Sequence, residues 1–343
     1  MNNITLIGLD LAKNIFQVCG LNKAGKVQFN RKVKRRDLMA CLLSYPNALV
    51  AMEACGTSHY WARRLIAQNI QVKLLPAQHV KAFTRGNKND SNDALAIAEA
   101  ASRPQLHEVA VKTLAQQDIQ TLLRIRTRHK SARKDIVNQL RGLLSEYGIV
   151  LPTGIDQIDK QIPSVLEDAE NGLSFIAREA IHGLYQEYRA LSLRLASDEK
   201  RLAVLVKENP LCQMLMRFRG IGIITAFALF CSVGDPRSFK NGRQFAAWLG
   251  LVPKHTGTGG KVVLGSMSKR GSAYLRTLLI HGARTIAQWL GKHDDPFSQW
   301  AKDLIARRGK HKSIIAIANK NARHIWVALT KGIDYVPGYY LSK

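Results

Sequence analysis

Hydrophobic and polar residues alternate along the first third of the chain in a pattern that predicts an α/β domain. Apolar runs at 4–8, 15–21 and 26–33, with a turn at 22–25, predict three antiparallel strands. Helical spacing and buried-type runs then follow in turn: a helix over 36–44, a strand over 48–52, a helix over 58–68, a strand over 72–75 and an Ala-rich helix over 90–101. The order β-β-β-α-β-α-β-α predicts an α/β domain over residues 1–109.

The pattern between residues 110 and 206 is almost wholly helical. Residues 116–147 and 175–206 place apolar side chains at three- and four-residue spacing with basic residues between them. Pro152, Gly154 and Pro163 predict a break between the two segments. Two long amphipathic helices in succession predict a helical spacer resembling a coiled coil.

The region from 207 to 343 is predicted to be mainly α-helical, with a Gly-rich loop at 257–265. Two basic helices are expected over 273–289 and 312–331. Residues 218–226 have the form of a helix-hairpin-helix turn, in which Gly220 and Gly222 let backbone N–H groups approach a phosphate. The alternative is an ordinary tight turn between core helices.

Charge narrows the class of partner. The chain carries 51 Lys and Arg against 25 Asp and Glu, a formal net charge of +26, and the excess is steepest towards the C-terminus. A polyanion is the natural partner and nucleic acid the first expectation. A solvated basic surface, a ribosomal protein or a protein of anionic membrane surfaces are the alternatives.

A membrane span, a secretory signal, a usual zinc site and a disulfide framework are not expected from the sequence. The longest apolar run, at 220–233, is too short to cross a bilayer, and no secretory signal is visible at the start. Five cysteines without a CxxC pair exclude a usual zinc site and a disulfide framework. We therefore expect a cytoplasmic protein, associated with the nucleoid when bound to DNA.

The few acidic residues of the first domain stand at unusual places. Asp10 ends the first predicted strand, Glu53 ends the fourth, and Asp90 and Asp93 share one face at the start of a helix. If strands one and four are neighbours, their ends bring Asp10 and Glu53 together, with the last helix nearby. Four carboxylates in one place predict an Mg²⁺ site for phosphoryl transfer. Taken singly, Asp90 could be a helix N-cap, Asp93 a first-turn acid and Asp10 a turn cap.

Basic residues surround the Gly-rich loop. The spacing GxxxxGK[ST] of a nucleotide-binding loop is absent, so we expect contacts to a nucleic-acid backbone. A flexible surface hairpin is the alternative. The expected phosphate contacts are Lys261, Lys269, Arg270, Arg276 and Arg284.

Several motifs, in order, resemble one family. They are GLDLAK from Gly8, EACGT from Glu53, KNDSNDA from Lys88, the Gly-Ile-Gly turn, RQFAAWLGLVP from Arg243 and SKRG from Ser268. Together they resemble the DEDD-type insertion-sequence transposases, a family that includes the Piv-like DNA invertases. The resemblance runs almost from end to end.

The resemblance implies a RuvC-like domain of the ribonuclease H fold, in which Asp10, Glu53, Asp90 and Asp93 match the family's metal-binding acids and two Mg²⁺ ions are expected. It implies a C-terminal transposase domain with a serine nucleophile that links covalently to DNA. It implies donor and target DNA, a structured noncoding bridge RNA as guide, and a dimer or tetramer whose site is completed between protomers.

The nucleophile position departs from the family pattern. Five residues past Pro253 the chain has Thr258 in place of serine. The β-branch of threonine restricts its χ1 torsion, although its hydroxyl can attack phosphorus. Thr256, Ser266 and Ser268 are the alternatives, and an impaired copy is a further one.

Two other functions compete with a covalent recombinase. A hydrolytic junction resolvase needs the four acids but no attacking side-chain hydroxyl. A non-catalytic nucleic-acid-binding protein needs neither, and neutralising its acids changes only affinity.

Overall fold

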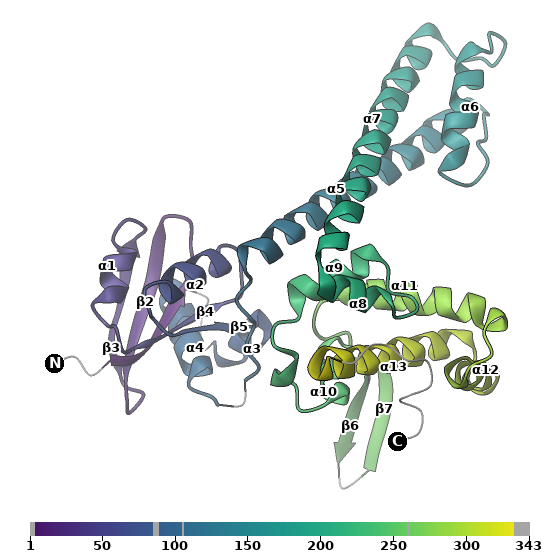
Figure 1. Cartoon of the computed structure of the whole chain (residues 1–343). Helices are drawn as coiled ribbons and strands as arrows, with labels where there is room; N and C mark the ends of the chain where they lie inside the picture. The colour runs from purple at the N-terminus through teal and green to yellow at the C-terminus, as the bar shows by residue number, and fades with distance from the viewer. Residues whose placement is uncertain (1–3, 85–88, 105, 259–260, 333–343) are drawn as a thin grey trace. The chain divides into compact units, whose positions relative to one another are not determined.

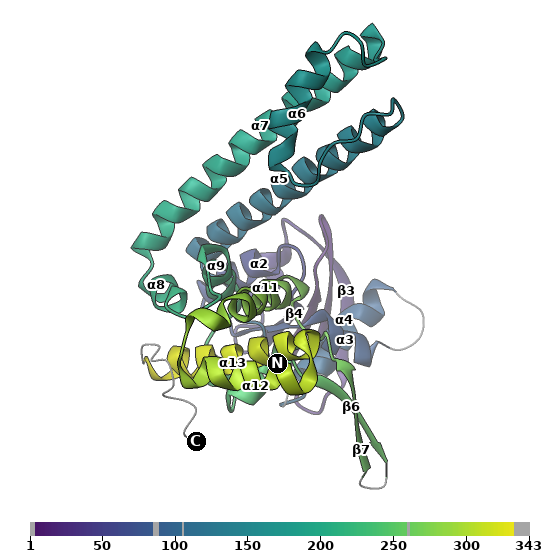
Figure 2. The ribbon, with the colours of Figure 1, turned by 90° about the vertical axis from the view of Figure 1, so that its right-hand side faces the viewer.

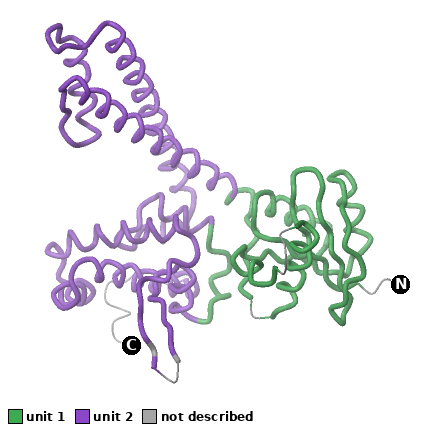
Figure 3. The backbone as a smooth tube through the Cα atoms, turned by 180° about the vertical axis from the view of Figure 1, so that it is seen from behind, with its two compact units in different colours: residues 1–116, 232–240 green, residues 117–231, 241–343 purple. Residues whose placement is uncertain are grey.

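The computed structural model describes residues 4–84, 89–104, 106–258 and 261–332 of the 343. It divides into two compact units, one of Met1–Gln116 with Ser232–Lys240 and the other of Gln117–Cys231 with Asn241–Lys343 (Figure 3). The finer division into three parts, after residues 109 and 206, stays a prediction.

The first unit is built on a five-stranded mixed sheet with the order β3-β2-β1-β4-β5 (Figure 1). Its strands are β1 (Ile4–Asp10), β2 (Ile15–Asn22), β3 (Val27–Lys34), β4 (Leu49–Glu53) and β5 (Val72–Leu75). β1, β2 and β3 pair antiparallel, while β1–β4 and β4–β5 pair parallel. The predicted strand sequence and the contact between strands one and four are thus confirmed.

Helices connect and cover these strands. They are α1 (Leu38–Leu43), α2 (Ser58–Ile66), α3 (Ala77–Val80), the 3-10 turn η1 (Lys81–Phe83) and α4 (Asp90–Ala101). The sequence pattern did not predict α3 or η1, which follow Pro76 directly. Elements this short have no apolar periodicity of their own to reveal them.

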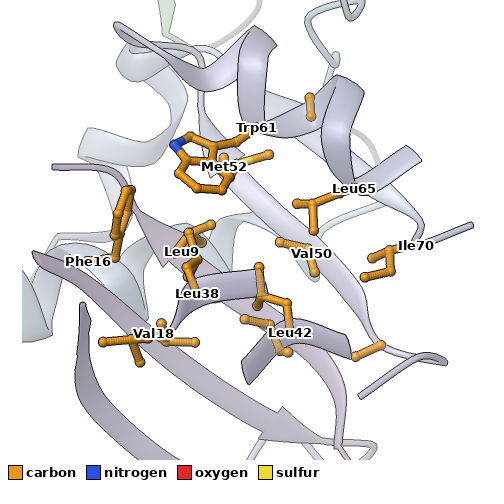
Figure 4. Close-up of a cluster of buried hydrophobic side chains, with 14 of the residues drawn as sticks. Leu9, Phe16, Val18, Leu38, Leu42, Val50, Met52, Trp61, Leu65 and Ile70 are labelled. Atoms are coloured by element: carbon orange, nitrogen blue, oxygen red, sulfur yellow. The ribbon is translucent and has the colours of Figure 1, made fainter. Parts of the chain in front are cut away.

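The two faces of the sheet carry separate cores. On one face, Leu9, Phe16, Val50 and Met52 pack with residues of α1 and α2, and Trp61 meets Phe16 edge to face (Figure 4). On the other face, Leu6, Cys19 and Ala51 pack against the alanines of α4. Because side chains of a strand alternate between faces, Asp10 and Glu53 belong to the α4 face.

A helical arm begins the second unit. It comprises α5 (Leu114–Ser145), α6 (Asp156–Glu167) and α7 (Phe175–Leu205), followed by the 3-10 turn η2 (Val206–Glu208). The prediction of two long helices is confirmed. Arg126 pairs with Glu199, and His129 lies 2.8 Å from Asp198, so polar contacts join α5 to α7.

The predicted break between the long helices holds a further helix, because Pro163 lies inside α6 and does not end it. Side chains of α7 hold α6 in place. The Arg178 guanidinium donates to the carbonyl oxygens of Val165 and Leu166, and the Tyr185 and Tyr188 hydroxyls donate to the Asp159 carboxylate.

The C-terminal region is helical with one β-hairpin. Its elements are α8 (Pro210–Met216), α9 (Ile223–Ser232), η3 (Pro236–Ser238), α10 (Gly242–Trp248), β6 (Pro253–Thr258), β7 (Lys261–Met267), α11 (Ala273–Trp289), η4 (Leu290–Lys292), α12 (Pro296–Arg308) and α13 (Lys310–Lys331). Both views show the β6–β7 hairpin projecting away from α10–α13 (Figures 1 and 2). The segment expected to be a Gly-rich loop is therefore a hairpin over most of its length. None of the described helices is both long and apolar enough to span a membrane.

Candidate functional site

Two strand ends place the first pair of acids. β1 and β4 run parallel with Leu9 opposite Met52, so Asp10 and Glu53 follow at the same level of neighbouring strands. Neighbouring strands lie about 4.8 Å apart, and both side chains project from the α4 face. Both residues are half-buried, with their carboxylates at the C-terminal edge of the parallel strands.

The start of α4 supplies the second pair. The Asn89 side chain accepts a hydrogen bond from the Asn92 amide and caps the helix, so Asp90 is not the N-cap. Asp90 and Asp93 occupy the first helical turn, where acidic residues are stabilised by the helix dipole. Asp93 is therefore a first-turn acid, and this position is compatible with its expected role in a metal site.

Glycine at position 8 lets α4 approach β1. A Cβ atom built on Gly8 would lie 2.2 Å from the Ala94 carbonyl oxygen and 2.8 Å from the Ala98 Cβ. No larger residue fits between the strand and the helix without moving one of them. Because α4 packs this closely on Gly8, its first turn lies near the end of β1. That end is Asp10, two residues after Gly8.

The four carboxylates influence one another electrostatically. The pKa of Asp10 is raised from 3.8 to about 6, first by burial and then by the negative charges of Asp93, Asp90 and Glu53; a hydrogen bond from the Leu11 amide opposes the rise. Burial alone needs no neighbouring charge, but the repulsive part of the rise requires carboxylates close to Asp10. The predicted acids from β1, β4 and α4 therefore form one cluster.

This cluster has the donor chemistry of a magnesium site. Carboxylate oxygens are the ligands that Mg²⁺ prefers, and a cation relieves the repulsion that raises the pKa of Asp10. Among the described residues, no three His, Cys, Asp or Glu side chains are already arranged around a common metal position. The donor set thus fits a hard cation by chemistry, whereas the side chains are not closed around a single point.

Cys55 is a member of this neighbourhood that the sequence pattern did not indicate. The pKa of its thiol is raised by burial and by the negative charges of Glu53 and Asp10. Its thiol lies 3.4 Å from the Gly56 carbonyl oxygen, just after β4. The only sequence signal was its position two residues after a candidate acid.

The candidate hydroxyls lie on the hairpin of the second unit. Thr258 is the last residue of β6 and pairs with Lys261, but its side chain lies outside the described residues. Thr256 is exposed on β6, and Ser266 is exposed on β7. The Ser268 hydroxyl is buried without a hydrogen-bond partner in the described part of the chain, and its amide donates to the Val252 carbonyl oxygen.

The two glycines of the 218–226 segment differ in surroundings. Gly220 has a φ of +76°, and a Cβ there would lie 2.6 Å from the Gly282 carbonyl oxygen of α11. Gly222 has no neighbour within 4 Å of such an atom. Gly220 therefore serves close packing between α11 and the turn before α9, whereas the backbone of Gly222 is open to a ligand.

Most of the predicted phosphate contacts are exposed. They are Lys261, Lys269, Arg270 and Arg284. Arg276 differs, because it is 9% exposed and its guanidinium donates to the Arg270 carbonyl oxygen at 3.0 Å. Its position on the buried face of α11, beside Leu275, makes it a support for the segment that carries Lys269 and Arg270.

Arg219 is a half-buried cation that the sequence pattern did not single out. Its guanidinium donates to the Asp295 carboxylate at 2.6 Å and to the Ser298 hydroxyl at 2.9 Å. The Asn321 side chain binds its carbonyl oxygen. The start of α12 and the middle of α13 are thus both tied to the residue before Gly220.

Comparisons with known proteins agree with the two regions in order. Residues 7–149 match the DEDD transposase profile of the IS110 group, and residues 212–299 match the profile described as the transposase IS116/IS110/IS902 family. The sheet with its acidic cluster and the helical region with its hairpin thus fall in the two matched parts of a DNA transposase.

Individual relatives cover nearly the whole chain. The transposase for insertion sequence element IS1111A of Coxiella burnetii is 41% identical over 98% of this chain and 92% of its own length. The transposase for insertion sequence element IS1328 of Yersinia enterocolitica is 37% identical over 97% and 98%. A pilin gene-inverting protein of Moraxella bovis is 23% identical over 92% and 91%. The chain belongs to the IS116/IS110/IS902 family of insertion-sequence transposases, and DNA is its substrate.

Proposed function

We propose that this transposase cuts and rejoins DNA by metal-dependent phosphoryl transfer through a covalent protein–DNA intermediate. The observation that carries the proposal is the cluster of Asp10, Glu53, Asp90 and Asp93, whose mutual repulsion contributes to raising the pKa of Asp10 to about 6. The net charge of +26 favours the polyanionic substrate on which such a cluster would act.

The fold of the first unit supports an assignment to the RuvC-like, ribonuclease H class. The order β3-β2-β1-β4-β5, with a three-stranded antiparallel meander followed by parallel strands, agrees with that expectation. The helix-hairpin-helix assignment for 218–226 rests on the tight turn between α8 and α9 and on the open backbone at Gly222.

Two Mg²⁺ ions are the proposed cofactors, held by Asp10, Glu53, Asp90 and Asp93. Bound there, they would stabilise negative charge on the scissile phosphate and on the leaving oxygen. Asp10 and Glu53 are fixed by the sheet, and Asp90 and Asp93 by the capped start of α4, so the four ligands are held by regular elements. Their placement on rigid elements favours a reproducible geometry.

The attacking group is proposed to be a hydroxyl of the β6–β7 hairpin, with Thr258 as the first candidate. Thr256, Ser266 and Ser268 remain the alternatives. In the attack the hydroxyl loses its proton and its oxygen bonds to phosphorus, while the bond from phosphorus to the leaving sugar oxygen breaks and that oxygen takes up a proton. Exposed Lys261, Lys269 and Arg270 favour a strand held by its phosphates beside this hairpin.

The remaining partners follow from the family. We propose donor and target DNA, a bridge RNA that supplies base specificity, and a dimer or tetramer acting on DNA in the cytoplasm and nucleoid. The long basic arm of α5 and α7 offers a surface suited to shape-based binding of RNA, and it would suit DNA equally.

A covalent-trapping assay tests the chemistry. The protein is mixed with Mg²⁺, labelled DNA of the element's ends and target, and RNA from the element's flanks, then denatured and separated on a gel. We expect a DNA–protein adduct that Thr258→Val abolishes and Thr258→Ser retains, because only the hydroxyl is needed. Thr256→Ala and Ser266→Ala run in parallel. Cleavage without any adduct would establish the hydrolytic function in its place.

A second arm tests the acids. Asp10→Ala should abolish cleavage and recombination while nucleic-acid binding stays nearly unchanged, since the basic surface is intact. Asp37→Ala, at an exposed carboxylate at the start of α1, is the matched control and should leave cleavage unchanged. Chelation should stop the wild-type reaction and added Mg²⁺ restore it. Full recombination by Asp10→Ala would refute the proposed site.

A further inference from the structure

Gln17 and Lys32 lie beside Asp10 on the two neighbouring strands of the sheet. In the register of β1, β2 and β3, Asp10 lies opposite Gln17, and Gln17 lies opposite Lys32. Cross-strand partners project to the same face, so both side chains lie on the α4 face with Asp10. Two strand spacings, about 10 Å, separate the Lys32 position from the Asp10 position.

A hydrogen-bonded chain ties this part of the sheet to the start of α4. The Asn30 side-chain amide donates to the Ser91 carbonyl oxygen at 3.0 Å, which orients the Asn30 side chain. The Gln17 amide then donates to the Asn30 Oδ1 at 2.6 Å. Ser91 follows Asp90 directly, so Gln17 and Asn30 hold β2 and β3 against the turn that carries a candidate metal ligand.

Gln17 keeps one polar atom without a partner. The residue is 6% exposed, and its Oε1 is buried with no hydrogen-bond partner among the described residues. A buried oxygen without a hydrogen-bond donor destabilises the folded state. Such atoms are rare in folded proteins, and one beside a candidate active site is accounted for when a water that accompanies a bound ligand supplies the donor.

A polar hollow of about 510 Å³ lies at this place. Gln17, Asn30, Lys32, Asp90 and Ser91 are among the residues that line it. Lys32 is exposed and forms no ion pair within the described part of the chain. Arg31 also lines the hollow, but its guanidinium is engaged elsewhere, 3.5 Å from the Cys41 thiol and 4.9 Å from the centre of the Phe29 ring. Of the two cations that line the hollow, Lys32 is therefore the one that we assign to a ligand.

We propose that this hollow is a subsite for the DNA strand that is being cut. Lys32 binds a backbone phosphate that flanks the scissile one, and Gln17 and Asn30 are positioning residues that hold Asp90 against the sheet. The proposal rests on the proposed function, because the strand in the hollow is the one that reaches Asp10. The ligand is the sugar–phosphate backbone of DNA, and no base is read here.

Lysine footprinting tests the subsite without any need for catalysis. The full chain is acetylated with an amine-reactive reagent in the absence of Mg²⁺, with and without excess oligothymidylate, and each lysine is quantified by mass spectrometry. Lys32 should be protected. Lys26, exposed at the turn end of the same hairpin, is the control and should react equally in both samples.

Each footprinting outcome decides the proposal. Protection of Lys32 without protection of Lys26 supports the subsite even if the wild-type protein cleaves nothing, in which case only the proposed function fails. Equal reactivity of Lys32 with and without DNA, or equal protection of Lys26, overturns the subsite and leaves the proposed function standing. Protection by oligouridylate and not by oligothymidylate overturns the assignment to DNA.

Variants measure the contribution of the contact. Lys32→Gln should slow single-turnover cleavage about tenfold, as expected for a charged hydrogen bond to phosphate. The plot of the logarithm of the DNA-binding constant against the logarithm of the salt concentration should also become less steep, by about 0.7 in slope. Lys26→Gln should change neither value, and Lys32→Arg should restore both. Unchanged cleavage and slope in Lys32→Gln, in a preparation whose wild type cleaves, would refute the phosphate contact.

Discussion

Gly220 and Gly222 stand two residues apart and carry the same expectation from the sequence, yet their surroundings separate them. Gly220 adopts a left-handed conformation and meets Gly282 backbone to backbone. Gly222 has no such constraint. A glycine pattern therefore marks the turn, but only the packing shows which glycine is structural and which is open to a phosphate.

Alanine substitutions should separate these two roles. Gly220→Ala adds backbone strain and a clash with Gly282, so we expect a loss of about 2–4 kcal/mol in the free energy of unfolding. Gly222→Ala should leave that free energy within about 0.5 kcal/mol and weaken DNA binding. Denaturant titration and fluorescence anisotropy measure the two effects. Equal destabilisation by both variants would contradict the assignment.

Helix α4 shows how an element carries residues to a site. Its alanines form a smooth face against β1 and β2, and Asn89 fixes where the helix begins. The Ala-rich pattern predicted the helix with its observed bounds, and the acids three residues apart share one face as expected. The sequence did not predict that α4 packs directly on Gly8. A single glycine in a strand can equally indicate a bulge or a bend.

Enlarging Gly8 should displace α4 from the sheet. In Gly8→Ala the new methyl group meets the Ala94 carbonyl oxygen and Ala98, so we expect a loss of about 1–3 kcal/mol in stability and a larger proportional loss of cleavage, because Asp90 and Asp93 move with the helix. Gly142→Ala, at an exposed position of α5, should stabilise the chain by about 0.5–1 kcal/mol. Wild-type cleavage by Gly8→Ala would show that the position of α4 is unimportant.

At the scale of the whole molecule, the two units respond to acid with opposite signs. Burial and neighbouring carboxylates raise the pKa of Asp10 from 3.8 to about 6, so the folded first unit binds a proton before the unfolded chain does. Its stability rises as pH falls from 6 towards 4. Burial, with the positive charges of Lys320 and Arg323, lowers the pKa of His324 from 6.5 to about 4. The second unit therefore loses stability as pH falls from 6.5 to 4.

Amide hydrogen exchange, measured in buffer free of divalent cations, tests these opposite pH dependences of stability in the two units. Between pH 7 and pH 5, and after correction for intrinsic exchange, protection should fall in α11–α13 and rise in β1 and β4. His324→Phe should remove the loss, and Asp10→Asn should stabilise the first unit at pH 7 and remove the gain. A common direction of change in both units of the wild type would refute the prediction.

Local pattern was sufficient for much of this protein. Strand alternation, helical spacing and scarce acids at strand ends predicted the sheet, the long helices and the candidate residues Asp10, Glu53, Asp90 and Asp93, because those signals lie within a few neighbouring residues. Motif order indicated the family for the same reason.

Other properties depend on contacts between residues distant in the chain, and only the tertiary structure decided them. The register Asp10–Gln17–Lys32 requires three paired strands. The burial of Arg276 requires the loop it supports. The raised pKa of Asp10 requires its burial and three further carboxylates, which come from β4 and α4. Arg178 of α7 binds the Val165 and Leu166 carbonyl oxygens and so fixes the C-terminal end of α6. Long-range packing and electrostatics, which no local pattern records, account for each of these.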